Sequence, residues 1–565
     1  MRRPNVLIIL TDDQGWGDLS VHGNTNLKTP NVDSLARDGA IFDRFYVCPV
    51  CAPTRAEFLT GRYHLRTGVH GVSTGAERLN LDEVTIADTF KSAGYATAAF
   101  GKWHNGTQHP YHPNARGFDE FFGFCSGHWG EYFDAEVEHN GQFTTGQGYL
   151  PDEITNRAID FLTTYSHTTQ PFFCYLAFNI PHTPFQVPDQ FYEKFRNRTI
   201  DMMATDPTQE NVDRTRAALA LCENIDWNVG RLLEQLDRLG ITDDTIIFYF
   251  GDNGPNGARW NGEMKGVKGS TDEGGVRVPG LMRWPSEIPA GTQIQQISGG
   301  IDLLPTLTDL TSINLIGHKP LDGRSLKPLL YGQDIDWPER LIFTHHREQI
   351  SVRNQRFRLA QNGQLYDMTD DPSQINDVSN VFPEVKSELN QAVADWRAEL
   401  LPIKDSRPFT VGYWQSTSLP ARDGIPHGNI QRSANAPNCS YFSNWVSIDD
   451  AMTWDIQVGT SGSYEAILYY TCSEVDVGST IEITFEKQSL KGQVVIAHDP
   501  PLIGKKNDRY PRRGESYVKD FKPLNLGTIE LPAGHGRLAL RALEVAGSQV
   551  MDLRRIVLNR LEKDK

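Results

Sequence analysis

The sequence lacks long apolar runs, is poor in cysteine and carries no excess of positive charge. Its 565 residues include only seven cysteines, and the formal net charge is -16. A membrane-spanning helix needs about 20 consecutive apolar residues; the chain has no such run, so we expect no membrane span. An acidic chain is also a poor non-specific ligand for nucleic acid, so we expect no nucleic-acid partner.

The start of the chain leaves little room for a leader. An apolar strand is expected at residues 6–10, whereas a secretory signal needs a basic stretch and then about 7 to 15 apolar residues. We therefore expect a cytoplasmic protein, or a periplasmic or secreted one if a signal peptide has been removed.

Residues 1–339 alternate between apolar runs and amphipathic stretches. The continuous apolar runs are typical of strands covered on both faces of a parallel sheet; they lie at residues 6–10, 96–100, 172–178 and 245–250. Residues 214–239 repeat apolar side chains every three or four positions, which predicts a helix. The alternation predicts an α/β domain with a mostly parallel sheet flanked by helices.

The pattern changes twice after this domain. Residues 340–405 combine short strand-like pieces with a predicted helix at 383–401, which indicates a small sheet-plus-helix subdomain. Residues 401–426 contain prolines and glycines and are interpreted as a linker.

Residues 406–565 are predicted to form an all-β sandwich accessory domain. Its expected strands lie near residues 452–458, 464–470, 480–485, 494–497, 538–543 and 556–558. Spacing alone leaves open whether Cys439 pairs with Cys472. Four aromatic residues are candidates for stacking on sugar or for packing at a domain junction: Tyr413, Trp414, Tyr441 and Trp445.

The most specific motif is Cys51-Ala52-Pro53-Thr54-Arg55, followed by Leu59-Thr60-Gly61-Arg62, or C-x-P-x-R-x3-L-T-G-R. So many fixed positions are very improbable by chance. Cys48 and Cys51 also fit a redox or zinc C-x-x-C pattern. That alternative is disfavoured because no second C-x-x-C pair or nearby histidine pair completes a zinc site.

Acidic and amide side chains follow two of the predicted strands. Asp12 and Asp13 come directly after the first apolar run, and Asp252 and Asn253 follow the run at 245–250. Ligands of open α/β sheets bind at the carboxyl ends of strands. A set of hard oxygen donors at that edge suits Ca²⁺ or Mg²⁺ rather than zinc, although Asp252-Asn253-Gly254 also fits a simple turn.

Three further motifs follow strands or occupy glycine-rich loops. They are Gly101-Lys102-Trp103-His104, Ile180-Pro181-His182-Thr183-Pro184, and the segment from Gly266 to Pro279 that contains Lys268. No G-x4-G-K-[ST] sequence is present, so the last segment is not a P-loop.

Taken in order, these motifs resemble those of type I sulfatases, which belong to the alkaline phosphatase superfamily. The resemblance covers roughly residues 4–400 and implies the fold of that superfamily. It also implies that a formylglycine-generating maturation enzyme oxidises Cys51 to Cα-formylglycine. The hydrate of this aldehyde would attack sulfur in a sulfate ester, form a covalent sulfo-enzyme on residue 51 and then release inorganic sulfate.

The same resemblance implies roles for individual residues. The metal ligands would be Asp12, Asp13, Asp252 and Asn253 together with the modified Cys51, and Ca²⁺ is preferred over Mg²⁺. Arg55 would hold the hydrate, Lys102 and Lys268 would bind the sulfate, His104 would act on the hydrate, and His182 would protonate the leaving alcohol.

The substrate is less well specified by the sequence. The last strands resemble galactose-binding-like modules of carbohydrate enzymes, so a sulfated glycan is the leading substrate class. The aromatic segment 127–140 is a plausible pocket wall, with His128, Trp129, Glu131 and Tyr132 as candidate substrate contacts and Ser126 as an alternative to His128. The alternatives are a broad aryl sulfatase, a phosphonate or phosphate monoester hydrolase of the same superfamily, and a non-catalytic glycan-binding protein.

Overall fold

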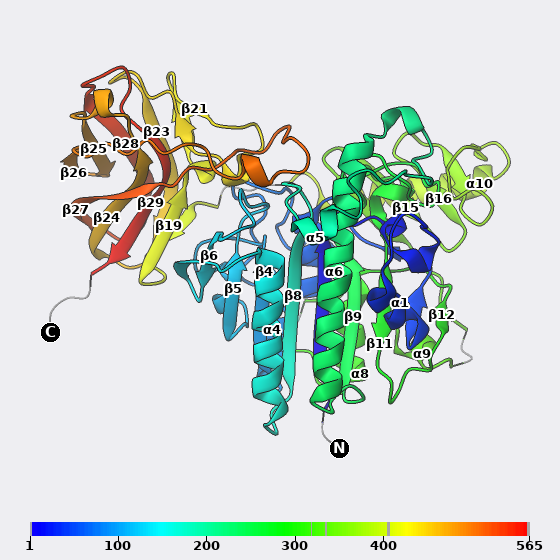
Figure 1. The fold of residues 1–565 in the computed structure, drawn as a ribbon. Helices are drawn as coiled ribbons and strands as arrows, with labels where there is room; N and C mark the ends of the chain where they lie inside the picture. The colour runs from blue at the N-terminus through cyan, green and yellow to red at the C-terminus, as the bar shows by residue number, and fades with distance from the viewer. Residues whose placement is uncertain (1–2, 318, 334–335, 404–406, 562–565) are drawn as a thin grey trace.

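The computed structural model describes residues 3–317, 319–333, 336–403 and 407–561. A large α/β unit occupies the centre of the molecule, a small sheet with one helix lies on one side of it, and a β-sandwich lies on the other (Figure 1).

The central sheet has ten strands, and its middle is parallel. The strand β1 (Asn5–Asp12) pairs in parallel with β8 (Phe172–Pro181) and with β9 (Thr245–Gly251). The strand β4 (Ala96–Lys102) pairs in parallel with β8 and with β5 (Glu120–Phe124). The edges are completed by β11 (Gly280–Arg283), β2 (Ala40–Phe42) and β12 (Thr292–Ile294) on one side, and by β6 (Glu136–His139) and β7 (Gln142–Thr145) on the other.

Helices cover both faces of this sheet, which explains why its middle strands are continuously apolar. Leu7 and Ile9 of β1 face a core shared with α4 (Leu150–Ser166) and α6 (Val212–Arg238). Val6 and Ile8 face the opposite core, to which α2 (Cys51–Thr60), α3 (Ile86–Ser92) and α8 (Leu303–Leu310) contribute. Figure 1 shows α4 and α6 side by side in front of the sheet. The predicted α/β architecture is therefore confirmed.

The small unit after the central domain is a four-stranded antiparallel sheet packed on one helix. The strands are β14 (Ile342–His346), β15 (Gln349–Arg353), β16 (Phe357–Leu359) and β17 (Leu365–Asp367), and the helix is α10 (Pro383–Leu400). A separate core containing Val352 and Leu389 joins the sheet to the helix.

The C-terminal region is a sandwich of two sheets around a single apolar core that includes Trp445 and Trp454. One sheet contains β18 (Phe409–Val411), β20 (Ile425–His427), β23 (Ala451–Val458), β25 (Thr480–Phe485), β26 (Gln488–Gln493) and β28 (Gly534–Glu544). The other contains β19 (Ser416–Pro420), β21 (Gln431–Arg432), β22 (Phe442–Ser443), β24 (Gly462–Thr471), β27 (Lys522–Leu531) and β29 (Asp552–Arg560).

Two expectations for this region were wrong, and the cysteine pairing that spacing left open is not formed. The stretch interpreted as a linker carries β18 and β19, which pair with strands of the sandwich. The strand expected at residues 494–497 is absent among the described residues, because β26 ends at Gln493. Cys439 and Cys472 are both free thiols, and the Cys439 Sγ instead donates a hydrogen bond to the His128 carbonyl at 3.3 Å.

A long connection between β26 and β27, residues 494–521, leaves the sandwich and reaches the central domain. We call it the docking loop. It is the orange segment that crosses the top of the molecule in Figure 1. Asp508 forms a bridge with Gln186, and the Arg509 amide donates to the Phe185 carbonyl at 2.9 Å. The loop thereby attaches the accessory domain close to the end of β8.

Among the described residues, no helix combines the length and the apolar character needed to cross a membrane.

Candidate active site

The parallel strands deliver four motifs to one edge of the sheet. The register places Thr11 of β1 opposite Gly251 of β9, and Asp12 opposite Pro181 of β8. The strand β4 ends at Lys102 on the same edge. Because parallel strands share their carboxyl edge, residues far apart in the sequence converge there.

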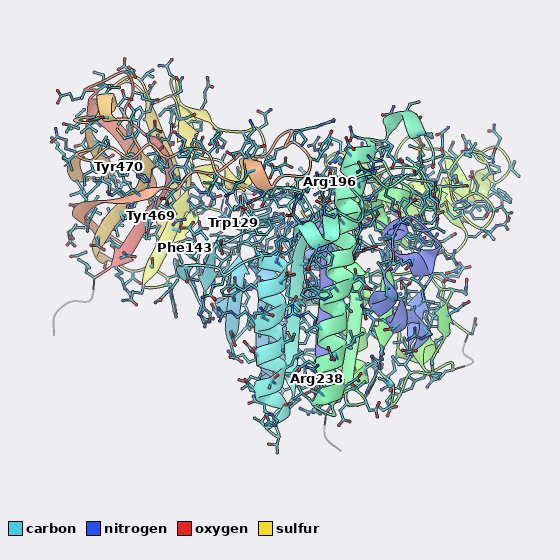
Figure 2. The ribbon with its side chains drawn as sticks, viewed as in Figure 1. Trp129, Phe143, Arg196, Arg238, Tyr469 and Tyr470 are labelled. Atoms are coloured by element: carbon cyan, nitrogen blue, oxygen red, sulfur yellow. The ribbon has the colours of Figure 1, made fainter. Side chains whose placement is uncertain are left out.

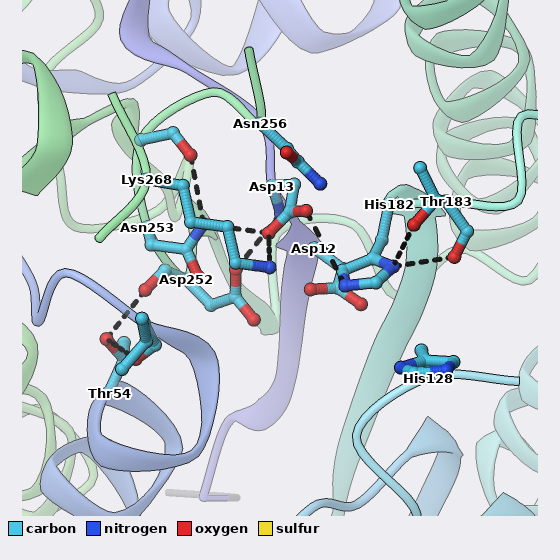
Figure 3. A network of polar contacts seen from close by, with 12 residues as sticks. Asp12, Asp13, Thr54, His128, His182, Thr183, Asp252, Asn253, Asn256 and Lys268 are labelled. Atoms are coloured by element: carbon cyan, nitrogen blue, oxygen red, sulfur yellow. Dashed lines mark hydrogen bonds and ion pairs between the residues drawn. The ribbon is translucent and has the colours of Figure 1, made fainter. Parts of the chain in front are cut away.

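Two ion pairs lie at the centre of this edge, one fully buried and one with a partly buried lysine. Figure 3 shows the second pair, Lys268 beside Asp13. The Lys102 Nζ lies 2.7 Å from Asp12 Oδ2, and the Lys268 Nζ lies 2.5 Å from Asp13 Oδ1. The Asn253 Nδ2 also donates to Asp13 Oδ1, at 2.8 Å. The two lysines therefore place positive charge next to the carboxylates of Asp12 and Asp13.

The oxygen atoms of this group fit a hard divalent cation. Asp12 Oδ1, Asp13 Oδ2 and Asn253 Oδ1 are buried and have no hydrogen-bond partner within the described part of the chain. Ligand atoms of Asp12, Cys51 and Asp252 lie within 4.8 Å of one another. Buried polar atoms are normally satisfied, and carboxylate and amide oxygens are the ligands that Ca²⁺ and Mg²⁺ prefer.

The electrostatics of the two central aspartates differ. Burial, together with the neighbouring charge of Asp12, raises the pKa of Asp252 to about 6. Burial would raise the pKa of Asp13 as well, but the charges of Lys268 and His182 outweigh it and hold that pKa below its ordinary value. A bound cation would remove the repulsion that raises the Asp252 value.

Cys51 is the first residue of α2 and is almost completely buried, with 3% of its surface exposed. Burial raises the pKa of its thiol above the ordinary value, so the side chain is not arranged as a reactive thiolate.

Arg55, one turn further along α2, is fully buried and points toward the same edge. Its guanidinium donates to Asp252 Oδ2 at 2.8 Å and to the Lys102 carbonyl at 2.8 Å. It also donates to the Tyr175 hydroxyl at 3.2 Å. Arg55 therefore fixes the direction of the Asp252 carboxylate.

His104 lies just beyond β4 in a left-handed backbone conformation, with φ of 63°. Its Nε2 lies 2.8 Å from the Val72 carbonyl, and its Nδ1 is buried without a described partner. Burial and the charge of Lys102 lower the pKa of the ring well below its ordinary value. Gly127 packs so closely that a Cβ atom there would lie 2.5 Å from His104 Nε2.

His182 follows β8 and lies on the other side of Asp13, as Figure 3 shows. Its Nε2 lies 3.7 Å from Asp13 Oδ2, and its Nδ1 lies 2.6 Å from the Thr183 carbonyl. The ring of His128 stacks against it with a centroid distance of 5.7 Å. Burial and the charge of Lys268 lower the pKa of His182 to about 4.

The four predicted substrate contacts fall in different environments. His128 lies in the site beside His182. Glu131 is buried at the docking loop, where it accepts a hydrogen bond from Asn507 at 3.0 Å. Trp129 lines a cavity at the domain junction together with Tyr469, in the region labelled in Figure 2.

Tyr132 lies behind the His182 segment, and its role as a substrate contact stays a prediction. The side chain is fully buried, and its hydroxyl oxygen lies 3.0 to 3.3 Å from the carbonyl oxygens of Asn179, His182 and Thr183, which compete for its single hydrogen. Its contacts support the His182 segment from behind.

Three residues of the sandwich region reach the site and escaped the sequence analysis. Arg422 donates to the Ser126 hydroxyl at 2.6 Å, and Asn438 lies 3.5 Å from the His128 Nδ1. Glu515 of the docking loop accepts a hydrogen bond from the Thr183 hydroxyl at 2.5 Å. Each partner is more than 290 residues away in the chain, and no local motif marks these positions.

Comparisons with known proteins agree with this geometry. The family model described as Sulfatase matches residues 4–313, and the model described as N-sulphoglucosamine sulphohydrolase, C-terminal, matches residues 268–399. The N-acetylgalactosamine-6-sulfatase of Mus musculus is 33% identical over 372 residues, which cover 59% of this chain and 68% of that protein. The Homo sapiens protein is 32% identical over 371 residues, which cover 59% and 67%.

Solved structures are also similar to this chain. The structure of Ps i-CgsB in complex with k-i-k-neocarrahexaose has a TM-score of 0.65 and 30% identity, and the match covers 71% of this chain and 94% of that one. The phosphonate monoester hydrolase of Agrobacterium radiobacter has a TM-score of 0.54 at 22% identity, over 71% of this chain and 96% of that one. The second similarity concerns the fold alone.

Proposed function

This chain belongs to the sulfatase family of the alkaline phosphatase superfamily, whose reaction is the hydrolysis of sulfate esters, and on that premise we propose that it removes sulfate from a sulfated carbohydrate. The observation that carries the proposal is the group of buried carboxylates and lysines around Cys51. The carbohydrate class is supported by a similar structure bound to neocarrahexaose and by the similar N-acetylgalactosamine-6-sulfatases.

Formylglycine at position 51 and a divalent cation would supply the nucleophile and much of the positive charge at this site. Asp12, Asp13, Asp252 and Asn253 would hold the cation, and Ca²⁺ suits their oxygen atoms better than zinc does. The burial of Cys51 supports its conversion by a maturation enzyme before the chain folds, because a buried side chain is closed to an enzyme.

The remaining residues would bind charge and move protons. Lys102 and Lys268 would hold the sulfate oxygens by electrostatic attraction, which is strong in a buried site. His104 has an unpartnered Nδ1 that would take a proton when sulfate leaves.

His182 would protonate the leaving oxygen. Its ring is neutral at pH 7 in the absence of substrate, because burial and Lys268 lower its pKa to about 4. A sulfate ester bound beside it would add negative charge and favour the protonated form.

The test is to produce the chain together with a formylglycine-generating enzyme and to measure inorganic sulfate by ion chromatography. The substrates would be a panel of sulfated mono- and oligosaccharides and 4-nitrophenyl sulfate, with 4-nitrophenyl phosphate and a phosphonate monoester as controls. We expect sulfate release from at least one carbohydrate. If the peptide of residues 45–55 carries the aldehyde and only phosphate or phosphonate esters are cleaved, the proposal is wrong.

A further inference from the structure

A second cavity adjoins the proposed active site and is built from two domains. It has a volume of about 170 Å³, several times the roughly 30 Å³ that one water occupies in the liquid. The central domain contributes Thr183, Phe185, Arg214 and Asn256 to its wall, and the docking loop contributes Tyr510, Pro511, Arg513, Gly514 and Glu515. Thr183 follows His182, and Figure 3 shows Asn256 and Thr183 beside Asp13 and His182.

Arg214 brings positive charge to this cavity and forms no ion pair with a carboxylate of the described residues. Its guanidinium donates to the Asn256 side chain at 2.7 Å and lies over the ring of Phe185 at 5.5 Å. Its Nε is buried and has no hydrogen-bond partner among the described residues. Burial lowers its pKa, as expected of a cation removed from water without a paired carboxylate.

Arg513 provides a second positive charge from the other wall. It donates to the Tyr510 hydroxyl at 2.6 Å, and its side chain is exposed. The Glu515 carboxylate also lines the cavity, but its oxygens accept hydrogen bonds from the Thr183 hydroxyl at 2.5 Å and the Gly514 amide at 3.4 Å. The side chains that line the cavity therefore include two arginines and one carboxylate, and their net charge is +1.

We propose that this cavity binds a second anionic group of the substrate, a sulfate or carboxylate on the sugar next to the one that carries the cleaved ester. The proposal rests on the proposed function. The family models end at residue 399, so the docking loop gives this enzyme a selectivity that membership of the family does not specify. Guanidinium groups suit this role because they bind sulfate and carboxylate with two hydrogen bonds.

The experiment compares two rates for the matured enzyme. One is kcat/KM for the most rapidly cleaved carbohydrate of the panel, and the other is kcat/KM for 4-nitrophenyl sulfate, which carries a single anionic group. We expect the best carbohydrate to carry a second anion on the adjacent sugar.

Arg513→Gln and Arg214→Gln should each lower the ratio of the two rates by about 10- to 100-fold, the size expected for loss of a charged hydrogen bond. The control is Lys506→Gln, which removes an exposed charge from the same loop outside the cavity and should leave the ratio unchanged.

The outcomes separate this proposal from the proposed function. A best substrate with one anionic group would overturn the proposal, and so would an unchanged ratio in both arginine variants. Cleavage of 4-nitrophenyl sulfate without cleavage of any carbohydrate would also overturn it. If the aldehyde-bearing enzyme released no sulfate from any tested substrate, the proposed function would be refuted, and this proposal with it.

Discussion

At the scale of single residues, side chains at this site are held in place by specific contacts. Arg55 fixes Asp252, Lys102 pairs with Asp12, and Gly127 leaves just enough room for His104. A buried charge that loses its partner is costly, so substitutions here should act on both stability and activity.

Replacement of Cys51 by serine should abolish turnover. Serine offers one hydroxyl, whereas a hydrated aldehyde offers two, and the second would be needed to release sulfate. We expect sulfate release to fall by at least about 10³-fold, within the range seen when a nucleophile is removed. The matched control is Cys48→Ser, a buried cysteine three residues earlier, which should keep multiple turnovers. Equal loss in both variants would favour the redox C-x-x-C alternative.

Glu57 should make the stability of the protein depend on pH. It is buried in α2, and burial raises its pKa from 4.5 to about 8. The unfolded chain releases this proton at lower pH than the folded one, so the stabilising contribution is complete below about pH 4.5 and is lost as the pH rises through 8.

Denaturant unfolding at pH 5, 6.5 and 8 would measure this effect. Glu57→Gln should reduce the decline in the free energy of unfolding over this range, whereas Glu399→Gln, an exposed control, should not. Identical declines in the wild type and Glu57→Gln would contradict the assignment.

At the scale of elements, the site depends on where strands end and on how one loop docks. The parallel register brings the ends of β1, β4, β8 and β9 together. Gln186, a fully buried side chain, is one of the residues that fix the docking loop to the end of β8. Its Nε2 donates to Asp508 Oδ1 at 2.8 Å and to the Gly504 carbonyl at 3.1 Å.

Gln186→Leu should loosen the docking loop. The substitution leaves the buried Tyr132 amide without its partner, at a cost of about 1 to 3 kcal/mol. It also removes two contacts with the docking loop, at the Gly504 carbonyl and the Asp508 carboxylate. Limited trypsin digestion should then cleave faster at Lys505 and Lys506, which are exposed. Gln170→Leu, at an exposed position, is the control, and an unchanged cleavage rate would show that other contacts hold the loop.

At the scale of the whole molecule, the described part of this acidic chain gathers oxygen atoms without hydrogen-bond partners at one buried edge. The net charge is -16, yet two lysines and one arginine lie among the three central aspartates. A cation at this edge would join three segments of the central domain, namely the end of β1, the start of α2 and the residues after β9, and would stabilise the folded state.

Removal of divalent cations with EDTA should therefore lower both the melting temperature and the rate of sulfate release, and added Ca²⁺ should restore them. A ligand at 100 times its Kd stabilises a protein by about 2.7 kcal/mol. Calorimetric scans of the wild type and Asp13→Asn would distinguish site binding from general screening, because the variant should lose most of the Ca²⁺-dependent shift. A wild-type melting temperature that does not respond to EDTA or Ca²⁺ would contradict the metal site.

The sequence by itself determined four strands and one long helix of the central domain, together with the motifs that follow the strands. Apolar runs predicted β1, β4, β8 and β9, and the three-to-four repeat predicted α6, because burial on one or both faces imposes a local period on the chain. The sequence also identified candidate site residues that belong to short contiguous motifs, such as Asp12, Lys102, His182 and Lys268.

Only the tertiary structure decided which of these residues touch and what surrounds them. The hydrogen bond between Glu515 and Thr183 joins positions 332 residues apart, and the burial of Tyr132 depends on backbone carbonyls of the segment after β8. Irregular loops carry no periodic signal, and their position is set by packing between domains rather than by neighbours in the sequence. For this reason the cavity between the docking loop and the central domain could be found only in the folded molecule.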